Sequence, residues 1–224
     1  NMEFVKKILI CDCPIGEKIP EINIKKIKTF LGKRKIPWLT AKDLCGISVK
    51  ESEKLKSFFS DSVILVIACH VRAVKWLFEK AGLNSSKLIF FDVEDKNANF
   101  ADFVEINALY FELCRENKTI KYDGEWIAWF PVIDYSRCKS CGQCLNFCLF
   151  GVYEKLPEKK ISVKTPENCK NKCPACARIC PENAIIFPKD LDPYISGAET
   201  FDDNKSNSNL RNFGAITPDE LYSI

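Results

Sequence analysis

The sequence has only one histidine, His70, among its 224 residues, and few of the motifs that bind nucleotides. A single histidine gives no basis for arguing a serine–histidine–aspartate triad along the chain. No Gly-x-Gly-x-x-Gly and no Gly-Lys-Ser/Thr motif occurs, so a dedicated nucleotide-binding loop is not expected. No stretch approaches the roughly 18 uncharged apolar residues of a membrane span, and the apolar run 8–10 is too short for a secretory signal.

Cysteine, in contrast, is abundant: the chain contains 13. An odd number of cysteines, most of them clustered at metal-ligand spacings, argues against a secreted disulfide framework. Thiols that serve as metal ligands must stay reduced, so we expect the protein in the cytoplasm.

Eight of these cysteines form two runs between residues 138 and 180. The first run has the spacing C-x2-C-x2-C-x3-C and the second has C-x3-C-x2-C-x3-C, followed by Pro181. Three closely spaced cysteines can hold three corners of a [4Fe–4S] cube, and the remote cysteine of the other run supplies the fourth ligand. We therefore expect two cubes with crossed ligands, one held by Cys138, Cys141, Cys144 and Cys180, the other by Cys169, Cys173, Cys176 and Cys148.

Two zinc ions are the alternative occupants of eight cysteines. Zinc sites usually use C-x2-C pairs separated by a longer loop, whereas here three cysteines fall within seven residues, 138–144. The spacing therefore favours iron–sulfur clusters over zinc.

The charge of the second half fits the same interpretation. Residues 131–190 carry 10 Lys/Arg and 6 Asp/Glu, a net charge of +4. Oxidised cubes with thiolate ligands are negative, so this basic excess offsets cluster charge rather than marking a nucleic-acid surface. No basic–aromatic interleaving occurs, and we expect no nucleic-acid partner.

Alternating strand and helix patterns precede the cysteine runs and predict an α/β domain with a mainly parallel sheet over residues 1–118. A connector over 119–130 leads into a small α+β domain over 131–190, which has a β-hairpin between its cysteine runs, and a polar, mobile tail is expected over 191–224. The expected elements are strands at 5–11, 36–40, 63–68 and 88–91, and helices at 22–31, 49–59, 71–81 and 99–116; the last helix would bury Cys114.

The segment 144–153, Cys-Leu-Asn-Phe-Cys-Leu-Phe-Gly-Val-Tyr, and the segment 173–181, Cys-Pro-Ala-Cys-Ala-Arg-Ile-Cys-Pro, resemble the 2[4Fe–4S] ferredoxin family. They are similar in particular to bacterial 4Fe–4S ferredoxin-like proteins with an α/β region before the clusters. The resemblance implies a dicluster ferredoxin-like domain and electron transfer, and it names no substrate. Two details depart from the usual pattern: one extra residue stands between Cys169 and Cys173, and Leu149 replaces a common proline.

Four further cysteines, Cys11, Cys13, Cys45 and Cys69, follow the ends of predicted strands. Ligands of an open parallel sheet gather outside the carboxyl ends of its strands, so these thiols could converge beside His70. Three interpretations stay open: a third iron–sulfur or metal site, a redox-active thiol pair or thiolate–His70 nucleophile, and ordinary buried cysteines with a hydrogen-bonded core histidine.

The strand ends 10–13 and 68–72 and the sequence 81–84, Ala-Gly-Leu-Asn, also faintly resemble the N-terminal domain of the A-type chain of heterodisulfide reductase. In that family the second strand end reads Ala-Cys-Ser-Pro-Arg, where this chain has His70 and Val71, and no flavin domain is present here.

Together these patterns predict an iron–sulfur electron carrier rather than a stand-alone enzyme. Two [4Fe–4S] clusters would pass single electrons between redox donor and acceptor proteins, and the α/β domain would dock or gate a partner. Two alternatives stay open: a reductase whose clusters feed a cysteine site in the first domain, and a non-catalytic redox sensor or assembly subunit. The sequence gives no indication of an oligomeric state.

Overall fold

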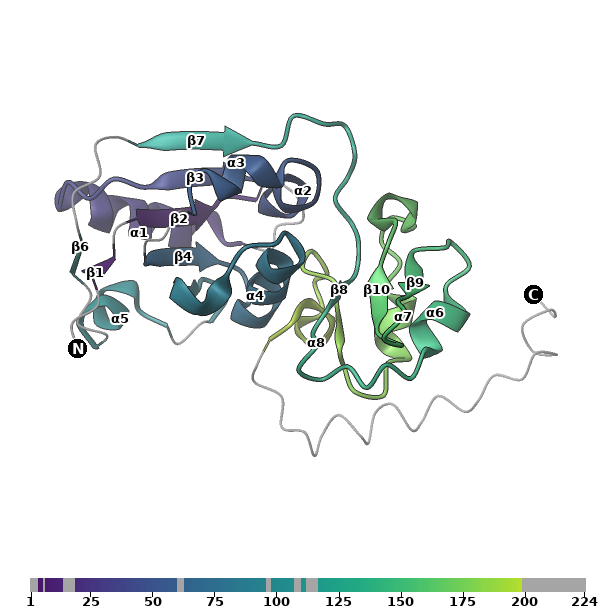
Figure 1. Cartoon of the computed structure of the whole chain (residues 1–224). Coiled ribbons are helices and arrows are strands. Elements are labelled where there is room, and N and C mark those ends of the chain that lie inside the picture. The colour runs from purple at the N-terminus through teal and green to yellow at the C-terminus, as the bar shows by residue number, and fades with distance from the viewer. Residues whose placement is uncertain are drawn as a thin grey trace.

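The computed structural model describes residues 4–5, 7–13, 19–59, 63–95, 98–106, 110–111 and 117–198. A five-stranded sheet organises the first part of the chain, with the order β5-β4-β2-β3-β7 and every neighbouring pair parallel (Figure 1). The strands are β2 (Lys7–Cys11), β3 (Leu39–Lys42), β4 (Ile64–Ala68), β5 (Leu88–Asp92) and β7 (Lys118–Lys121).

Helices cover both faces of this sheet. They are α1 (Glu21–Lys33), α2 (Leu44–Lys50), α3 (Ser52–Lys56), α4 (Val71–Lys80) and α5 (Phe100–Ile106), with a 3₁₀ turn η1 at Ser85–Lys87. Side chains of α2, α3 and α4 share one core cluster with Leu9 and Val66, whereas those of α1 and α5 share a second cluster with Ile10 and Leu65. All five residues of β4 are buried, as its uninterrupted apolar sequence requires in a sheet covered on both sides.

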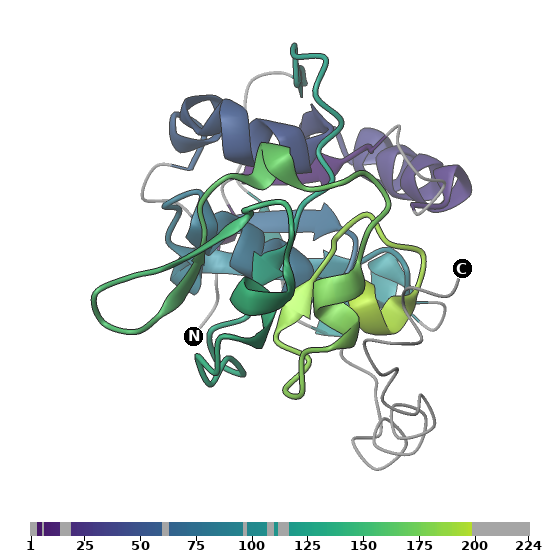
Figure 2. The ribbon, with the colours of Figure 1, turned by 90° about the vertical axis from the view of Figure 1, so that its right-hand side faces the viewer.

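The second part of the chain is small and built from short elements. β8 (Val132–Ile133) pairs antiparallel with β11 (Ile185–Ile186), and β9 (Tyr153–Lys155) pairs antiparallel with β10 (Ile161–Val163) as a hairpin that projects to one side in Figure 2. The helical pieces are α6 (Gln143–Phe147), η2 (Pro166–Asn168), α7 (Ala175–Arg178) and α8 (Pro193–Ser196). This part, residues 131–198, is called the cluster segment below.

The two parts share a continuous apolar core. Phe130, Val132 and Ile186 belong to the same buried cluster as the helices α2 to α4. Lys80, at the end of α4, donates to the carbonyl of Val163 at 3.1 Å. Because these contacts come from both ends of the cluster segment, α4 and the cluster segment are packed as one body.

The predicted fold class is confirmed: an α/β layer with a parallel sheet precedes a small α+β segment. The helix expected over 99–116 is wrong at Tyr110–Phe111, which form strand β6 and pair with β1 (Phe4–Val5); the observed helix α5 covers Phe100–Ile106. The helix expected over 49–59 begins earlier, at Leu44, and is interrupted at Glu51. Cys114 lies outside the described residues.

Two boundaries also differ from the expected ones. β7 lies at 118–121, within the stretch expected as a connector, and extends the sheet by one edge strand. Residues 191–198 include α8, whose Ile195 and Ser196 are buried, so the fold continues into the stretch expected as a mobile tail. Among the helices of the described ranges, none has the length and apolar character needed to cross a bilayer.

Candidate metal centres

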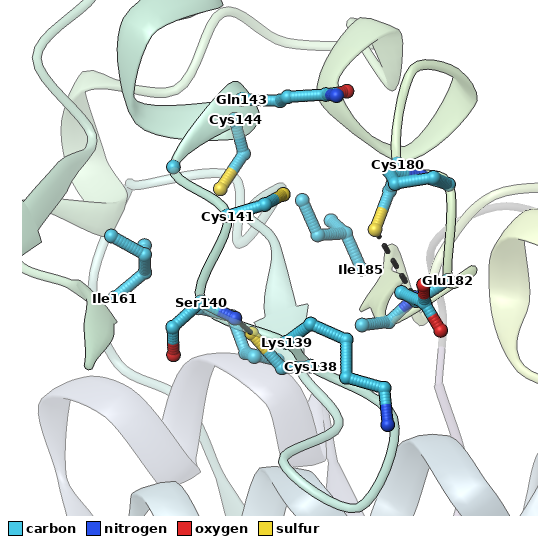
Figure 3. A pocket seen from close by; sticks show the side chains of 14 residues that line it. Cys138, Lys139, Ser140, Cys141, Gln143, Cys144, Ile161, Cys180, Glu182 and Ile185 are labelled. Atoms are coloured by element: carbon cyan, nitrogen blue, oxygen red, sulfur yellow. Dashed lines mark hydrogen bonds between the residues drawn. The ribbon is translucent and has the colours of Figure 1, made fainter. Parts of the chain in front are cut away.

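Four cysteines of the cluster segment face one pocket, which Figure 3 shows from close by. Cys138 and Cys141 lie in the loop that leads from β8 into α6, Cys144 lies in the first turn of α6, and Cys180 follows α7 (Figure 3). Ser140 and Gly142 have positive φ values of 54° and 82° in this loop, a conformation that lets the chain curl around the pocket. The structure thus brings together the four cysteines that the crossed-ligand rule assigns to the first cube.

Backbone N–H groups point at two sulfurs of this group. The amide of Ser140 donates to Cys138 Sγ and that of Ala184 donates to Cys180 Sγ, each at 3.4 Å. Such hydrogen bonds stabilise negative charge on sulfur, and in iron–sulfur proteins they help to set the reduction potential.

The second group consists of Cys169, Cys173 and Cys176 together with Cys148. The thiol of Cys169 lies within electrostatic reach of Cys176, Cys173 and Cys148, although Cys148 is 21 positions earlier in the chain. The hydroxyl of the buried Tyr153 donates to Cys176 Sγ at 3.0 Å. This grouping again follows the crossed pattern.

The metal-free thiols are poor acids. Burial, reinforced by neighbouring thiols, raises the pKa of Cys144 and of Cys169 to about 12 and that of Cys176 to about 11. Metal binding must therefore displace protons from these sulfurs.

The donor set fits a multi-iron cluster better than a single ion. Within the ranges that the structure describes, no three cysteine, histidine or carboxylate side chains are arranged to hold one metal ion. A [4Fe–4S] cube is bound through one thiolate at each of four irons, so its ligands surround a volume rather than a point.

The four N-terminal cysteines also lie together, at the carboxyl edge of the sheet. Cys11 and Cys45 are buried in one core cluster, and Cys13 and Cys69 pack against the same cluster. Burial raises the pKa of Cys11 well above its ordinary range, and the thiols of Cys13, Cys69 and Cys45 raise it further. Their proximity agrees with the expected convergence of strand ends.

Two charged residues complete this N-terminal thiol group, defined as Cys11, Cys13, Cys45 and Cys69. Lys189, which comes from the cluster segment, places Nζ 2.7 Å from Asp43 Oδ1. Both side chains are buried, and the ammonium of Lys189 lies within electrostatic reach of the thiols of Cys45 and Cys13. Sequence reasoning missed both residues because neither belongs to a cysteine motif and they are far apart in the chain.

Two carboxylates flank the ring of His70. Its Nδ1 forms a hydrogen bond with Asp92 Oδ2 at 3.0 Å, and Glu94 Oε2 lies 3.2 Å from its Nε2. Both ring nitrogens therefore have acidic neighbours at or just beyond the end of β5.

Comparison with known proteins identifies the cluster segment. Residues 130–181 match the family model described as a 4Fe–4S dicluster domain. An uncharacterized ferredoxin of Methanocaldococcus jannaschii is 48% identical over 68 residues, which are 30% of this chain and 46% of that protein. The match therefore spans less than half the length of that relative.

Two further relatives are covered over most of their length. The pyruvate synthase subunit PorD of Methanothermobacter marburgensis is 37% identical over 76 residues, 34% of this chain and 82% of that subunit. Ferredoxin-3 of a Nostoc species is 34% identical over 68 residues, 23% of this chain and 69% of that protein. No solved structure matches. The predicted 4Fe–4S ferredoxin-like segment is confirmed, and the likeness to the A-type chain of heterodisulfide reductase stays a prediction.

Proposed function

Since the chain belongs to the 4Fe–4S ferredoxin-like family, whose members transfer electrons, we propose that it holds two [4Fe–4S] clusters and passes single electrons between partner proteins. The observation that carries the proposal is the sorting of eight sulfurs into two groups of four, each completed by a cysteine of the other run. The ligands would be Cys138, Cys141, Cys144 and Cys180 for one cluster, and Cys169, Cys173, Cys176 and Cys148 for the other.

The clusters supply the redox chemistry, and the chain sets potential, spacing and access. The Ser140 and Ala184 amides and the Tyr153 hydroxyl would stabilise the more negative, reduced state by donating to sulfur. Cys144 lies within electrostatic reach of both Cys180 in its own group and Cys176 in the other. The two groups are therefore neighbours, which suits transfer of an electron between them.

The α/β layer would gate access to the clusters from one side. Its helix α4 packs against β8, and Lys50 at the end of α2 forms an ion pair with Glu167, two residues before Cys169. Partners would reach the clusters through the faces that remain open. The similarity to a component of pyruvate synthase supports a partner-associated role. We place the protein in the cytoplasm because its ligand thiols must remain reduced.

The cluster count is tested by ligand substitution after anaerobic reconstitution of the full chain. Cys141→Ser and Cys173→Ser should each remove the iron and sulfide of one cluster, about four atoms of each, and abolish one of two interacting electron paramagnetic resonance signals. The matched controls Lys139→Ala and Asn171→Ala, exposed neighbours in the same loops, should keep both clusters. If either cysteine variant retains the full iron content, its assignment as a ligand is wrong.

Gating is tested separately, with a small oxidant such as ferricyanide. The double variant Lys50→Ala, Arg72→Met would loosen the α/β layer from the cluster segment. Oxidation of the reduced protein should then become faster in stopped-flow measurements. Equal rates in the parent and the double variant would show that the α/β layer does not shield the clusters.

A further inference from the structure

The N-terminal thiol group lies where the parallel sheet meets the cluster segment. Cys11 ends β2 in register with Ala41 of β3, and Cys69 directly follows β4, the neighbour of β2 on its other side. Cys45 lies in the first turn of α2, three residues beyond β3. The carboxyl ends of the strands point toward the cluster segment in Figure 1. Adjacent parallel strands thus deliver four thiols to one edge.

The chemistry of this edge differs from that of an ordinary core. Cys11 and Cys45 are only 4% and 8% exposed, and a charged lysine stands among them. Burial of an ammonium is strongly unfavourable unless an anion compensates it. Asp43 provides that anion: its Oδ1 lies 2.7 Å from Lys189 Nζ and also accepts from the Gly46 amide at 3.2 Å.

Asp43 already compensates the charge of Lys189, so the ion pair alone does not require thiolates. If the four thiols bind a cluster as thiolates, the same ammonium also lies close enough to Cys45 and Cys13 to offset part of their negative charge. Four cysteine sulfurs within electrostatic reach of one another are the donor set of a [4Fe–4S] cube, which takes one thiolate at each of its four irons.

We propose that Cys11, Cys13, Cys45 and Cys69 hold a third [4Fe–4S] cluster, and that Lys189 from the cluster segment lies beside it as the residue that raises its potential. The proposal extends the proposed function, because the electrons for this centre would come from the two clusters of the cluster segment. Each transfer moves one electron, so oxidation of a donor cluster balances reduction at the N-terminal site, and no bond forms or breaks.

The packing provides a short route for that electron. Cys169, a proposed ligand of the second cluster, packs against the core cluster that contains Cys11 and Cys45. From Cys45 to Lys50 the helix α2 rises by about 7.5 Å, and Lys50 then pairs with Glu167, two residues from Cys169. The second cluster is thus the natural donor to the N-terminal site.

The first experiment counts iron and sulfide in the reconstituted full chain and locates iron by anomalous scattering at the iron edge. Three centres and about twelve irons per chain are expected, against two centres and about eight if the proposal is wrong. Cys45→Ser and Cys69→Ser should lower the count to about eight while preserving the paramagnetic signals of the other two clusters. The control Ser48→Ala, a buried polar residue one turn beyond Cys45, should keep all three.

The outcomes separate this proposal from the proposed function. About eight irons, unchanged by Cys45→Ser, would overturn the third centre and leave the two-cluster protein intact, whereas fewer than eight would count against the two clusters themselves. A disulfide among the four thiols, seen by mass spectrometry after oxidation of a protein with about eight irons, would also overturn the third centre.

A second variant keeps the test meaningful if the cysteine variants fail to fold. Lys189→Gln keeps a polar, hydrogen-bonding side chain and removes the charge. Redox titration followed by paramagnetic resonance should show a more negative potential at one centre and unchanged potentials at the other two. If the reduction potentials of all three centres are unchanged, the proposal that Lys189 raises the potential of the third cluster is wrong.

Discussion

Arg72 and Asp134 form a buried ion pair that joins helix α4 to the start of the cluster segment. The Arg72 Nε lies 2.6 Å from Asp134 Oδ2, and the same guanidinium donates to the carbonyl of Asn183. Burial acts to raise the pKa of Asp134, but its bonds with Ser136 and Arg72 outweigh burial and hold the pKa below its usual value. Since the backbone carbonyl of Asp134 also accepts from the Cys138 amide at 3.0 Å, this pair fixes the first ligand loop to the α/β layer.

Replacement of Arg72 by methionine should destabilise the protein strongly. It would remove the buried cation of the Asp134 carboxylate and leave the more exposed Arg137, whose Nε lies 3.6 Å from the same oxygen; loss of a buried partner typically costs about 3–5 kcal/mol. Anaerobic thermal unfolding of the reconstituted protein measures the loss. Lys75→Met, an exposed change on the same helix, should stay within about 0.5 kcal/mol of the parent; two equally mild variants would contradict the role of the pair.

Tyr153→Phe should lower the reduction potential of one cluster. The substitution removes the hydroxyl that donates to Cys176 Sγ, and therefore destabilises the more negative, reduced state. Redox titration should show one potential shifted downward and the other unchanged. Tyr135→Phe is the matched control, because the Tyr135 hydroxyl donates to the carbonyl of Ile161 rather than to sulfur. A potential that responds equally to both changes would argue against the sulfur bond.

The metal-free protein should show slow alkylation at its partly buried ligand thiols. Because burial raises the pKa of Cys144 and of Cys169 to about 12, little thiolate exists at pH 8, and the thiolate is the nucleophile. Below that pKa, labelling by iodoacetamide should rise about tenfold per pH unit. Peptide mass spectrometry with N-acetylcysteine as the reference thiol measures the rates. Labelling as fast as the reference at pH 8 would contradict the burial of these thiols.

Gly46→Ala should destabilise the N-terminal thiol group. A Cβ at Gly46 would lie 2.8 Å from Asp43 Oδ2 and from the ring of Tyr122, and overpacking of this kind costs about 1–3 kcal/mol. Gly32→Ala offers the control, since a Cβ there meets no atom within 4 Å and alanine favours the helix. Thermal unfolding should separate the two variants; the same melting temperature for both would show that this site can expand.

The parallel sheet could be predicted because the sequences of most of its strands, read locally, already indicate a strand. β4 is apolar throughout and flanked by helical periodicity, so sequence alone indicates a strand covered on both faces. The helix expected over 99–116 failed because Tyr110 and Phe111 stand at helical spacing yet pair with β1, more than 100 residues away. Local periodicity contains no information about that partner.

The two cysteine groups of the cluster segment can be predicted from cysteine spacing, because three ligands of each group lie within a few residues of one another in the sequence. Only the fourth ligand of each group is remote, and because the cysteine pattern occurs twice, the last cysteine of each run can be assigned to the other group. Asp43 and Lys189 are different. Their pairing depends on how the cluster segment docks on α2, and a buried lysine looks like any other lysine in the sequence.

The position of Lys189 in the chain has a consequence for biosynthesis. All five strands of the parallel sheet have been synthesised once translation reaches Lys121. The ion pair between Asp43 and Lys189, however, can form only after residue 189 has been synthesised. Until then the nascent layer holds an uncompensated carboxylate beside four thiols. An excised α/β layer should therefore be a poor folding unit, because the contact between Asp43 and Lys189 forms only after every ligand of the cluster segment has been translated.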